Sequence, residues 1–339
     1  MNTRHKYLFI VAVVVTGMLA IAPTSNASGR PPLSKQERAE KFWTNKRISQ
    51  AVSRDFVRDA RTGRFEMRGK PVNPDVITGA SWNGGGVVAE STGKVFFSMG
   101  TSYYACSASV VNDAVSTRSI IVTAAHCAFD EVNNRFAENW IFIPAYDVNP
   151  SSFDPSGLFC ETTLYGCWAA QSFVVSNDYA TAGGFTVEAT LHDYAFAIVG
   201  VGGNADTQLD ATVGSQSIET AGQVELETES WIFGYPAAGK YKGKDLVYCR
   251  NLLSYDGKYG VDWQTYKLNC GMTGGSSGGP WYRQFSVLEP TNGMGITFSV
   301  TSYGYGGTKN LYGPVFGTEI AAMLVVASTT TTNVRYGAS

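Results

Sequence analysis

Charge and histidine are both scarce in this sequence of 339 residues. Charged residues make up 16% of the chain, against about 25% in a typical soluble protein, and only three residues are histidines. The low charge excludes a coiled coil, and the 44% hydrophobic content excludes a disordered chain. The net charge of −2 argues against a nucleic-acid-binding protein. The 37 glycines and 13% aromatic residues instead favour short strands joined by tight turns.

No hydrophobic run is long enough to cross a bilayer. The longest, Leu8–Ala22, has 15 residues, whereas a transmembrane helix needs about 20. Basic residues precede this run, and the small residues Ser25 and Ala27 follow it, as in a secretory signal peptide. We therefore expect residues 1–27 to be removed and the remaining chain to be secreted, with no membrane association. An uncleaved anchor helix is the alternative.

Positive charge is concentrated in one stretch near the N-terminus. Residues 28–70 carry a net charge of +7, whereas residues 71–339 carry −11. The basic stretch contains no cysteine, and we expect residues 28–75 to be a separate unit, either a propeptide or a solvated arm. Its charge is opposite to that of the body, which favours docking. The alternative is a mobile basic tail.

Six cysteines follow the signal peptide, and an even number suggests disulfide bonds in an exported chain. Six cysteines allow 15 connectivities, and spacing alone does not establish the pairing. The short spacings suggest the pairs Cys106–Cys127, Cys160–Cys167 and Cys249–Cys270. A zinc site is the alternative, and it is disfavoured because the sequence has no C-x-x-C motif and few histidines.

From about residue 76 onward, β-branched or aromatic runs alternate with Gly, Asn, Asp and Pro, which predicts an antiparallel all-β fold. Only Gly317–Val326 has convincing helical spacing. The stretch Val201–Ser215 is the best candidate for a linker between two halves. The expected strands are 95–97, 109–111, 119–123, 140–143, 195–200, 230–234 and 297–303.

Two histidines remain in the mature chain, and His126 is the better candidate for acid–base chemistry. It follows the apolar run Ile121–Thr123 and precedes Cys127. A strand end and a disulfide would fix the backbone on both sides of the imidazole, as a positioned general base requires. The alternative is a structural histidine.

Glycines surround Ser277 in the segment Thr273–Pro280. They let the chain turn sharply and bring backbone N–H groups close to a bound carbonyl. The N–H groups of Gly275 and Ser277 could then form an oxyanion hole around a nucleophilic Ser277. The alternative is a Gly/Ser-rich hairpin loop.

A carboxylate must orient the imidazole of such a base, and Asp193 stands at the mouth of an apolar strand. The neighbouring His192 should face the other way on an alternating strand. The order His126, Asp193, Ser277 is that of the chymotrypsin triad. The chain resembles the chymotrypsin-like serine endopeptidases, in particular the secreted bacterial branch that includes the glutamyl endopeptidases. The resemblance spans roughly residues 76–327 and rests on segments 106–109, 123–127, 192–195, 275–280 and 301–304.

The resemblance implies two antiparallel six-stranded β-barrels, residues 76–205 and 206–339, with a C-terminal helix and an active site between the barrels. His126 and Asp193 would come from the first barrel and Ser277 from the second. Cys106 would pair with Cys127. The expected partners are polypeptide substrates of a monomeric enzyme that needs no metal and no cofactor.

The resemblance also implies where substrate binds. Ser302, Tyr303 and Gly304 would form the strand that binds the substrate main chain, beside the pocket for the residue that precedes the scissile bond. Gly271 and Thr273 would line this pocket. In trypsin-type enzymes an Asp stands where this chain has Gly271, so a preference for Arg or Lys lacks its usual anchor.

Two further departures bear on activation and specificity. Animal trypsin-like enzymes carry an Asp before the nucleophile that pairs with a newly freed N-terminus, and this chain has Ser276 there, so that switch is absent. Glutamyl endopeptidases place a His where this chain has Ser302, so preference for Glu or for a neutral side chain stays open. The alternatives to an enzyme are a catalytically inactive, protease-like binding module and a secreted carbohydrate-binding protein.

Overall fold

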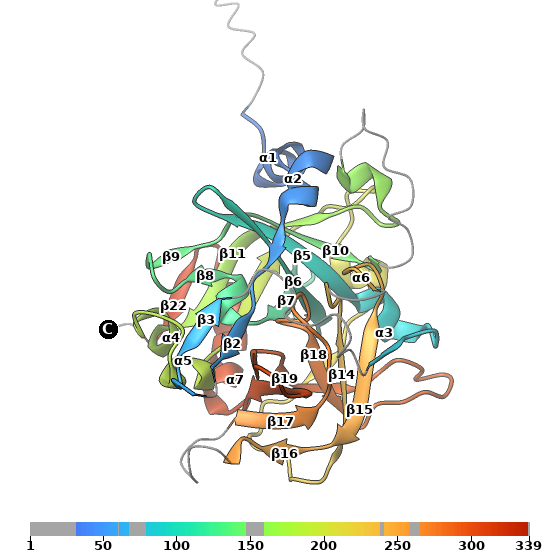
Figure 1. Ribbon diagram of the computed structural model, residues 1–339. Helices are drawn as coiled ribbons and strands as arrows, with labels where there is room; N and C mark the ends of the chain where they lie inside the picture. The colour runs from blue at the N-terminus through green and yellow to red at the C-terminus, as the bar shows by residue number, and fades with distance from the viewer. Residues whose placement is uncertain are drawn as a thin grey trace, which may run out of the picture. The chain divides into compact units, whose positions relative to one another are not determined.

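The computed structural model describes residues 32–59, 61–67, 79–146, 159–237, 241–257 and 265–337. The expected signal peptide and its cleavage site lie outside these residues. The described residues from Leu33 onward fold as one unit, in which two β-rich halves lie side by side (Figure 1).

A closed six-stranded barrel forms the first half. Its strands run in the order β6-β5-β10-β11-β12-β7, and pairing of β6 with β7 closes the ring. Both faces of β5 are buried, which explains the apolar residues Val95, Phe96 and Phe97 in succession at its centre. Val95, Phe97 and Ile121 are among the side chains of the barrel core. The strand bounds are β5 Thr92–Met99, β6 Ser102–Val111, β7 Ser119–Thr123, β10 Glu138–Pro144, β11 Trp168–Ser176 and β12 Ala195–Val199.

The second half consists of two six-stranded sheets that share one core. The first sheet has the order β13-β19-β18-β14-β15-β4, and the second has the order β16-β17-β21-β20-β2-β3. Ile232, Trp281 and Phe298 of the first sheet pack with Tyr266 and Leu268 of the second. The bounds in the first sheet are β4 Ala80–Ser81, β13 Ser217–Ile218, β14 Glu229–Gly234, β15 Val247–Leu252, β18 Pro280–Arg283 and β19 Ile296–Val300. Those in the second are β2 Phe56–Arg58, β3 Phe65–Met67, β16 Ser254–Tyr255, β17 Thr265–Asn269, β20 Tyr303–Tyr305 and β21 Asn310–Pro314.

The expected all-β architecture with a terminal helix is confirmed, with small shifts in the elements. Helix α7 covers Thr318–Thr329, one turn beyond the predicted end, and buries Ile320 and Met323. The expected strand 297–303 is split, because β19 ends at Val300 and β20 begins at Tyr303. The candidate linker Val201–Ser215 contains a short helix, α6 (Leu209–Val213).

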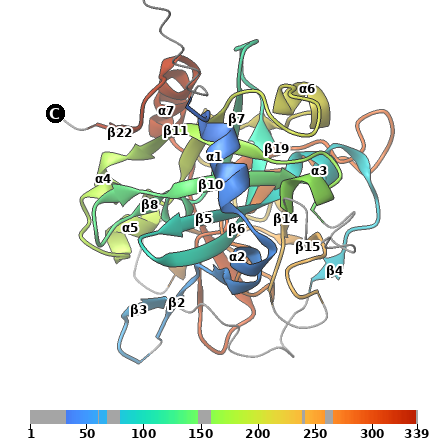
Figure 2. The same ribbon diagram turned by 90° about the horizontal axis from the view of Figure 1, so that it is seen from above.

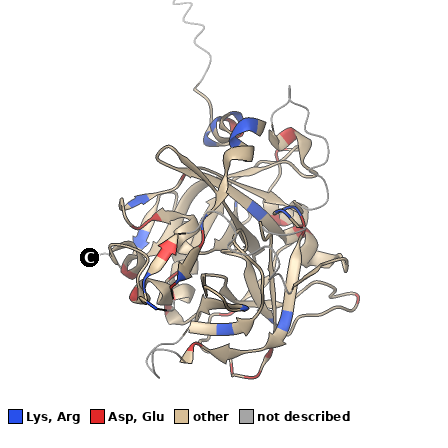
Figure 3. Ribbon diagram, viewed as in Figure 1, with Lys and Arg blue, Asp and Glu red and all other residues tan. Residues whose placement is uncertain are grey.

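The basic arm contains two helices that the sequence analysis did not predict, α1 (Lys35–Phe42) and α2 (Asn45–Gln50). Ser34 and Glu37 form a capping box at the start of α1. Helix α1 lies across β10 and β11 (Figure 2), and Lys and Arg gather on it (Figure 3). Trp43 is fully buried, and its indole N–H donates to the carbonyl of Asn139 at 2.6 Å. The described part of the arm is therefore packed on the body.

Two strands extend the arm from these helices into the body. Strand β1 (Val52–Ser53) pairs in parallel with β6, and β2 pairs in parallel with β20. Strand β3 then returns antiparallel to β2. The arm thus contacts both halves of the body.

Three disulfides form, with the pairing that the short spacings suggested: Cys106–Cys127, Cys160–Cys167 and Cys249–Cys270. No helix in the described ranges is both long and apolar enough to span a membrane. The remaining elements are α3 Gly86–Ser91, α4 Asn177–Ala180, α5 Val187–Leu191, β8 Phe129–Asp130, β9 Arg135–Phe136, β22 Val334–Tyr336 and two 3₁₀ turns, Ala125–Cys127 and Phe159–Thr162.

Candidate active site

Neighbouring strands bring His126 and Asp193 together. His126 lies in the 3₁₀ turn that follows β7, and Asp193 precedes β12, which pairs with β7. The Cys106–Cys127 disulfide anchors the histidine turn to β6. His126 Nδ1 lies 2.8 Å from Asp193 Oδ2, and both side chains are fully buried.

Two further hydrogen bonds hold the Asp193 carboxylate. The backbone N–H of His126 donates to Oδ1 at 2.9 Å, and the hydroxyl of Ser302 donates to Oδ2 at 2.5 Å. With a carboxylate on its Nδ1 side, the neutral imidazole carries its proton on Nδ1 and leaves Nε2 as an acceptor. This is the tautomer that a general base for a serine hydroxyl requires.

Ser277 lies in a turn that only glycine can form at two positions. Gly275 has φ +97° and Gly278 has φ +78°, and a Cβ on Gly278 would lie 2.1 Å from Thr123 Oγ1. The Ser277 carbonyl accepts from the N–H of Ser107 at 2.7 Å, and the Ser107 hydroxyl donates to the Gly275 carbonyl at 2.7 Å. Strand β6 of the first half thereby holds the serine loop of the second half.

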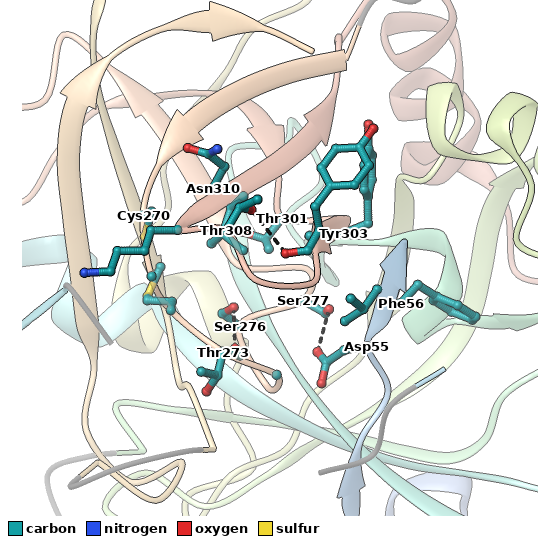
Figure 4. Close-up of a pocket in the computed structure, with 18 of the residues that line it drawn as sticks. Asp55, Phe56, Cys270, Thr273, Ser276, Ser277, Thr301, Tyr303, Thr308 and Asn310 are labelled. Atoms are coloured by element: carbon teal, nitrogen blue, oxygen red, sulfur yellow. Dashed lines mark hydrogen bonds between the residues drawn. The ribbon is translucent and has the colours of Figure 1, made fainter. Parts of the chain in front are cut away.

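A cavity of ≈ 430 Å³ opens beside Ser277 (Figure 4). All five residues that the sequence analysis assigned to substrate binding line it: Gly271, Thr273, Ser302, Tyr303 and Gly304. Among the lining residues only Asp55 and Lys309 carry charge, and the Lys309 side chain is exposed. The cavity is therefore mostly uncharged.

Asp55, a residue of the basic arm, occupies the centre of this site. The hydroxyl of Ser277 donates to Asp55 Oδ1 at 2.9 Å, and the N–H of Gly275 donates to the same oxygen at 3.0 Å (Figure 4). His126 Nε2 has no hydrogen-bond partner among the described residues. Burial raises the pKa of Asp55 to about 6, although bonds from Gly275 and Ser277 and the nearby His126 act in the opposite direction.

The sequence analysis missed Asp55 because it looked for strands only beyond residue 76. The signal in the sequence was weak, since only the pair Phe56-Val57 is aromatic and β-branched there, and Ser53, Arg54 and Asp55 precede it.

His192 points away from His126 and lies in a different cluster. It caps helix α5 and is not on the strand that the sequence analysis expected, because β12 begins only at Ala195. Its Nδ1 lies 2.9 Å from Glu319 Oε2. The hydrogen bond to Glu319 raises the pKa of His192, and partial burial opposes this effect. Cys106, His126 and Cys127 could hold a metal by distance alone, but both sulfurs are oxidised in one disulfide and provide no thiolate ligand.

Two solved proteases are similar to this chain at more than 30% identity. The protease Anisep from Arthrobacter nicotinovorans shares 32% identity over 71% of this chain and 96% of its own, with a TM-score of 0.57. The thermostable serine protease AL20 from an extremophilic microorganism shares 33% identity over 72% of this chain and 99% of its own, with a TM-score of 0.58. This chain belongs to the chymotrypsin-like serine protease family.

Another structure of the chymotrypsin-like family shows the same fold at lower identity. A Glu endopeptidase shares 18% identity over 75% of this chain and 100% of its own, with a TM-score of 0.52. A branch similar to the glutamyl endopeptidases is thus compatible with the fold. No family model and no curated protein matches the sequence.

Proposed function

We propose that the chain is a secreted serine endopeptidase that uses Ser277 as nucleophile, His126 as general base and Asp193 as the carboxylate that orients it. The observation that carries this proposal is the buried Asp193–His126 pair, whose Nε2 atom is unpartnered within the described chain, next to a serine on a glycine turn. The three disulfides and the N-terminal signal pattern support export.

The reaction follows from this arrangement once a substrate carbonyl lies next to Ser277. Nε2 of His126 takes the hydroxyl proton as Oγ of Ser277 bonds to the carbonyl carbon. The carbonyl oxygen becomes an oxyanion, which the N–H groups of Gly275 and Ser277 stabilise. The C–N bond then breaks, the leaving amine takes the proton from His126, and water hydrolyses the acyl-enzyme by the same steps.

The cavity supports a preference for neutral side chains before the scissile bond. Gly271 provides no carboxylate for Arg or Lys. A buried substrate carboxylate also needs a compensating partner, and the Ser302 hydroxyl already donates to Asp193. Among the described residues that line the cavity, the exposed Lys309 is the cation that a substrate Glu side chain could pair with.

The test is a peptide-library cleavage profile of the secreted protein after mild trypsin digestion of its arm, with Ser277→Ala treated identically. Cleavage by the parent alone supports the proposal, and we expect His126→Ala to lower kcat by roughly 10⁴-fold or more. Most cuts should follow neutral residues, and a profile dominated by Glu would refute the specificity argument. Equal activity of Ser277→Ala and the parent would refute Ser277 as the nucleophile. No cleavage by either folded protein would favour a protease-like binding module.

A further inference from the structure

We propose that the arm strands β1 to β3 are a built-in inhibitor that passes through the substrate cleft in the direction opposite to substrate. The carboxylate of Asp55 takes the place of the substrate carbonyl oxygen. This inference rests on the proposed protease function, and it adds the means by which the same chain keeps that function latent.

Asp55 meets the groups that would act on substrate. Its Oδ1 accepts both from the Gly275 N–H, an expected oxyanion donor, and from the Ser277 hydroxyl. Its Oδ2 lies so close to Gly274 that a Cβ there would be 1.7 Å away. A negative oxygen bound to the N–H of Gly275 resembles the oxyanion of the transition state. While it is in place, the serine hydroxyl points to Asp55 and not to His126.

The strand direction explains how the arm can lie in the cleft without presenting a peptide bond to the serine. Phe56, Val57 and Arg58 pair in parallel with Tyr303, Gly304 and Tyr305 in turn. The arm therefore leaves Ser277 as it passes along β20. A substrate whose residues before the scissile bond lie along β20 must approach Ser277 and so run antiparallel to the strand. In the arm, the side chain of Asp55 reaches the serine instead of a main-chain carbonyl.

Contacts on both sides of Asp55 anchor the arm. The buried Arg54 guanidinium donates to the His126 carbonyl and to Glu131 Oε2, the latter at 2.8 Å. On the other side, the Phe56 ring stacks on Phe185 with centroids 3.8 Å apart and covers the His126 ring edge-on at 5.4 Å. These contacts leave His126 fully buried, so a substrate can reach it only after the arm moves.

The experiment measures how fast a fluorescent fluorophosphonate labels Ser277 in each band of a denaturing gel. Full-length and trypsin-digested protein are thereby measured separately in one sample. The variants are Asp55→Ala and Asp55→Asn in the full chain. The control is Asp59→Asn, which removes the same charge from the partly exposed turn of the arm and keeps an acceptor for the Thr62 N–H.

We expect the full-length parent to label at least tenfold more slowly than the digested band. Asp55→Ala should raise the full-length rate about tenfold or more, because a charge-assisted hydrogen bond is lost. Asp55→Asn keeps an acceptor oxygen and removes the charge that burial disfavours, so at pH 7 it should label no faster than the parent. Asp59→Asn should leave the rate unchanged. The inference is overturned if the digested band labels well but Asp55→Ala labels at the parental rate. If no band labels in any variant, the proposed function fails, and the inference fails with it.

The strand direction has its own test. The inference predicts that active protein does not cut its own arm at the bonds that join Asp55 to Arg58, so mass spectrometry of its termini should find none there. Self-cleavage within this stretch in the parent, absent from Ser277→Ala, would overturn the reversed direction.

Discussion

Raising the pH should loosen the arm through Asp55. Its pKa in the docked arm is about 6, against an ordinary value of 3.8, because burial disfavours the charged carboxylate. The docked arm therefore binds a proton more tightly than the free arm does. This contribution to the free energy of docking is fully present below about pH 4 and is lost between about pH 4 and pH 6. Above pH 6 the docking free energy no longer changes through Asp55.

The magnitude follows from the two pKa values. One pKa unit corresponds to about 1.4 kcal/mol, so a shift of about two units amounts to roughly 3 kcal/mol, or a factor of roughly 100 in the docking equilibrium. His126 lies close to Asp55 and is present in both proteins to be compared. The buried Arg54–Glu131 pair flanks Asp55 and is unchanged in the Asp55→Asn variant with which the parent is compared below.

The assay compares full-length parent with Asp55→Asn, which cannot titrate at this position. Fluorophosphonate labelling rates are measured from pH 4 to pH 8, and the parent rate is divided by the variant rate at each pH. The ratio removes the pH effects that both proteins share. It should rise by up to about 100-fold between pH 4 and pH 6 and then level off. A flat ratio, or one that falls with pH, would refute the reasoning.

Three other substitutions test separate parts of the structure. Ser302→Ala removes a hydrogen bond to Asp193, so kcat of the digested enzyme should fall about tenfold with KM little changed; an effect on KM alone would place Ser302 in substrate binding instead. Arg54→Met leaves the buried Glu131 without its cation, which should weaken docking of the arm by about 3–5 kcal/mol and make the full-length band label faster. The double variant Arg54→Met/Glu131→Leu, which removes the unpaired charge, should restore slow labelling. Gly278→Ala should lower the free energy of unfolding by about 2 kcal/mol or more in chemical denaturation, because its φ is positive and its Cβ would meet Thr123; a loss below 0.5 kcal/mol, about the effect of an ordinary surface substitution, would contradict this.

The prediction of the fold succeeded where local sequence carries the information. Strand β7 has the predicted bounds, 119–123, because an unbroken β-branched run with both faces buried has few other stable conformations. The split between β19 and β20 could not be predicted in this way. There the N–H of Thr301 donates to the Gly279 carbonyl and that of Ser302 to the Tyr312 carbonyl, and both partners are distant along the chain.

The residues of the candidate site were likewise predicted where short local motifs mark them. His126, Asp193 and Ser277 were singled out from short motifs and their order, and their catalytic roles stay predictions that the proposed experiments test. Helices α1 and α2 were missed, since the basic composition of the arm concealed two capped helices and a buried tryptophan.

By itself, the sequence determined which residues can do chemistry, which runs become strands, and that the arm is basic and distinct in composition. Tertiary structure alone decided which way the Ser277 hydroxyl points and what meets it. The physical reason is distance along the chain: Asp55 and Ser277 are 222 residues apart, and no local pattern encodes their contact. They meet because β2 adds to β20 and β1 adds to β6, and strand pairing of this kind depends on edges that exist only in the folded body.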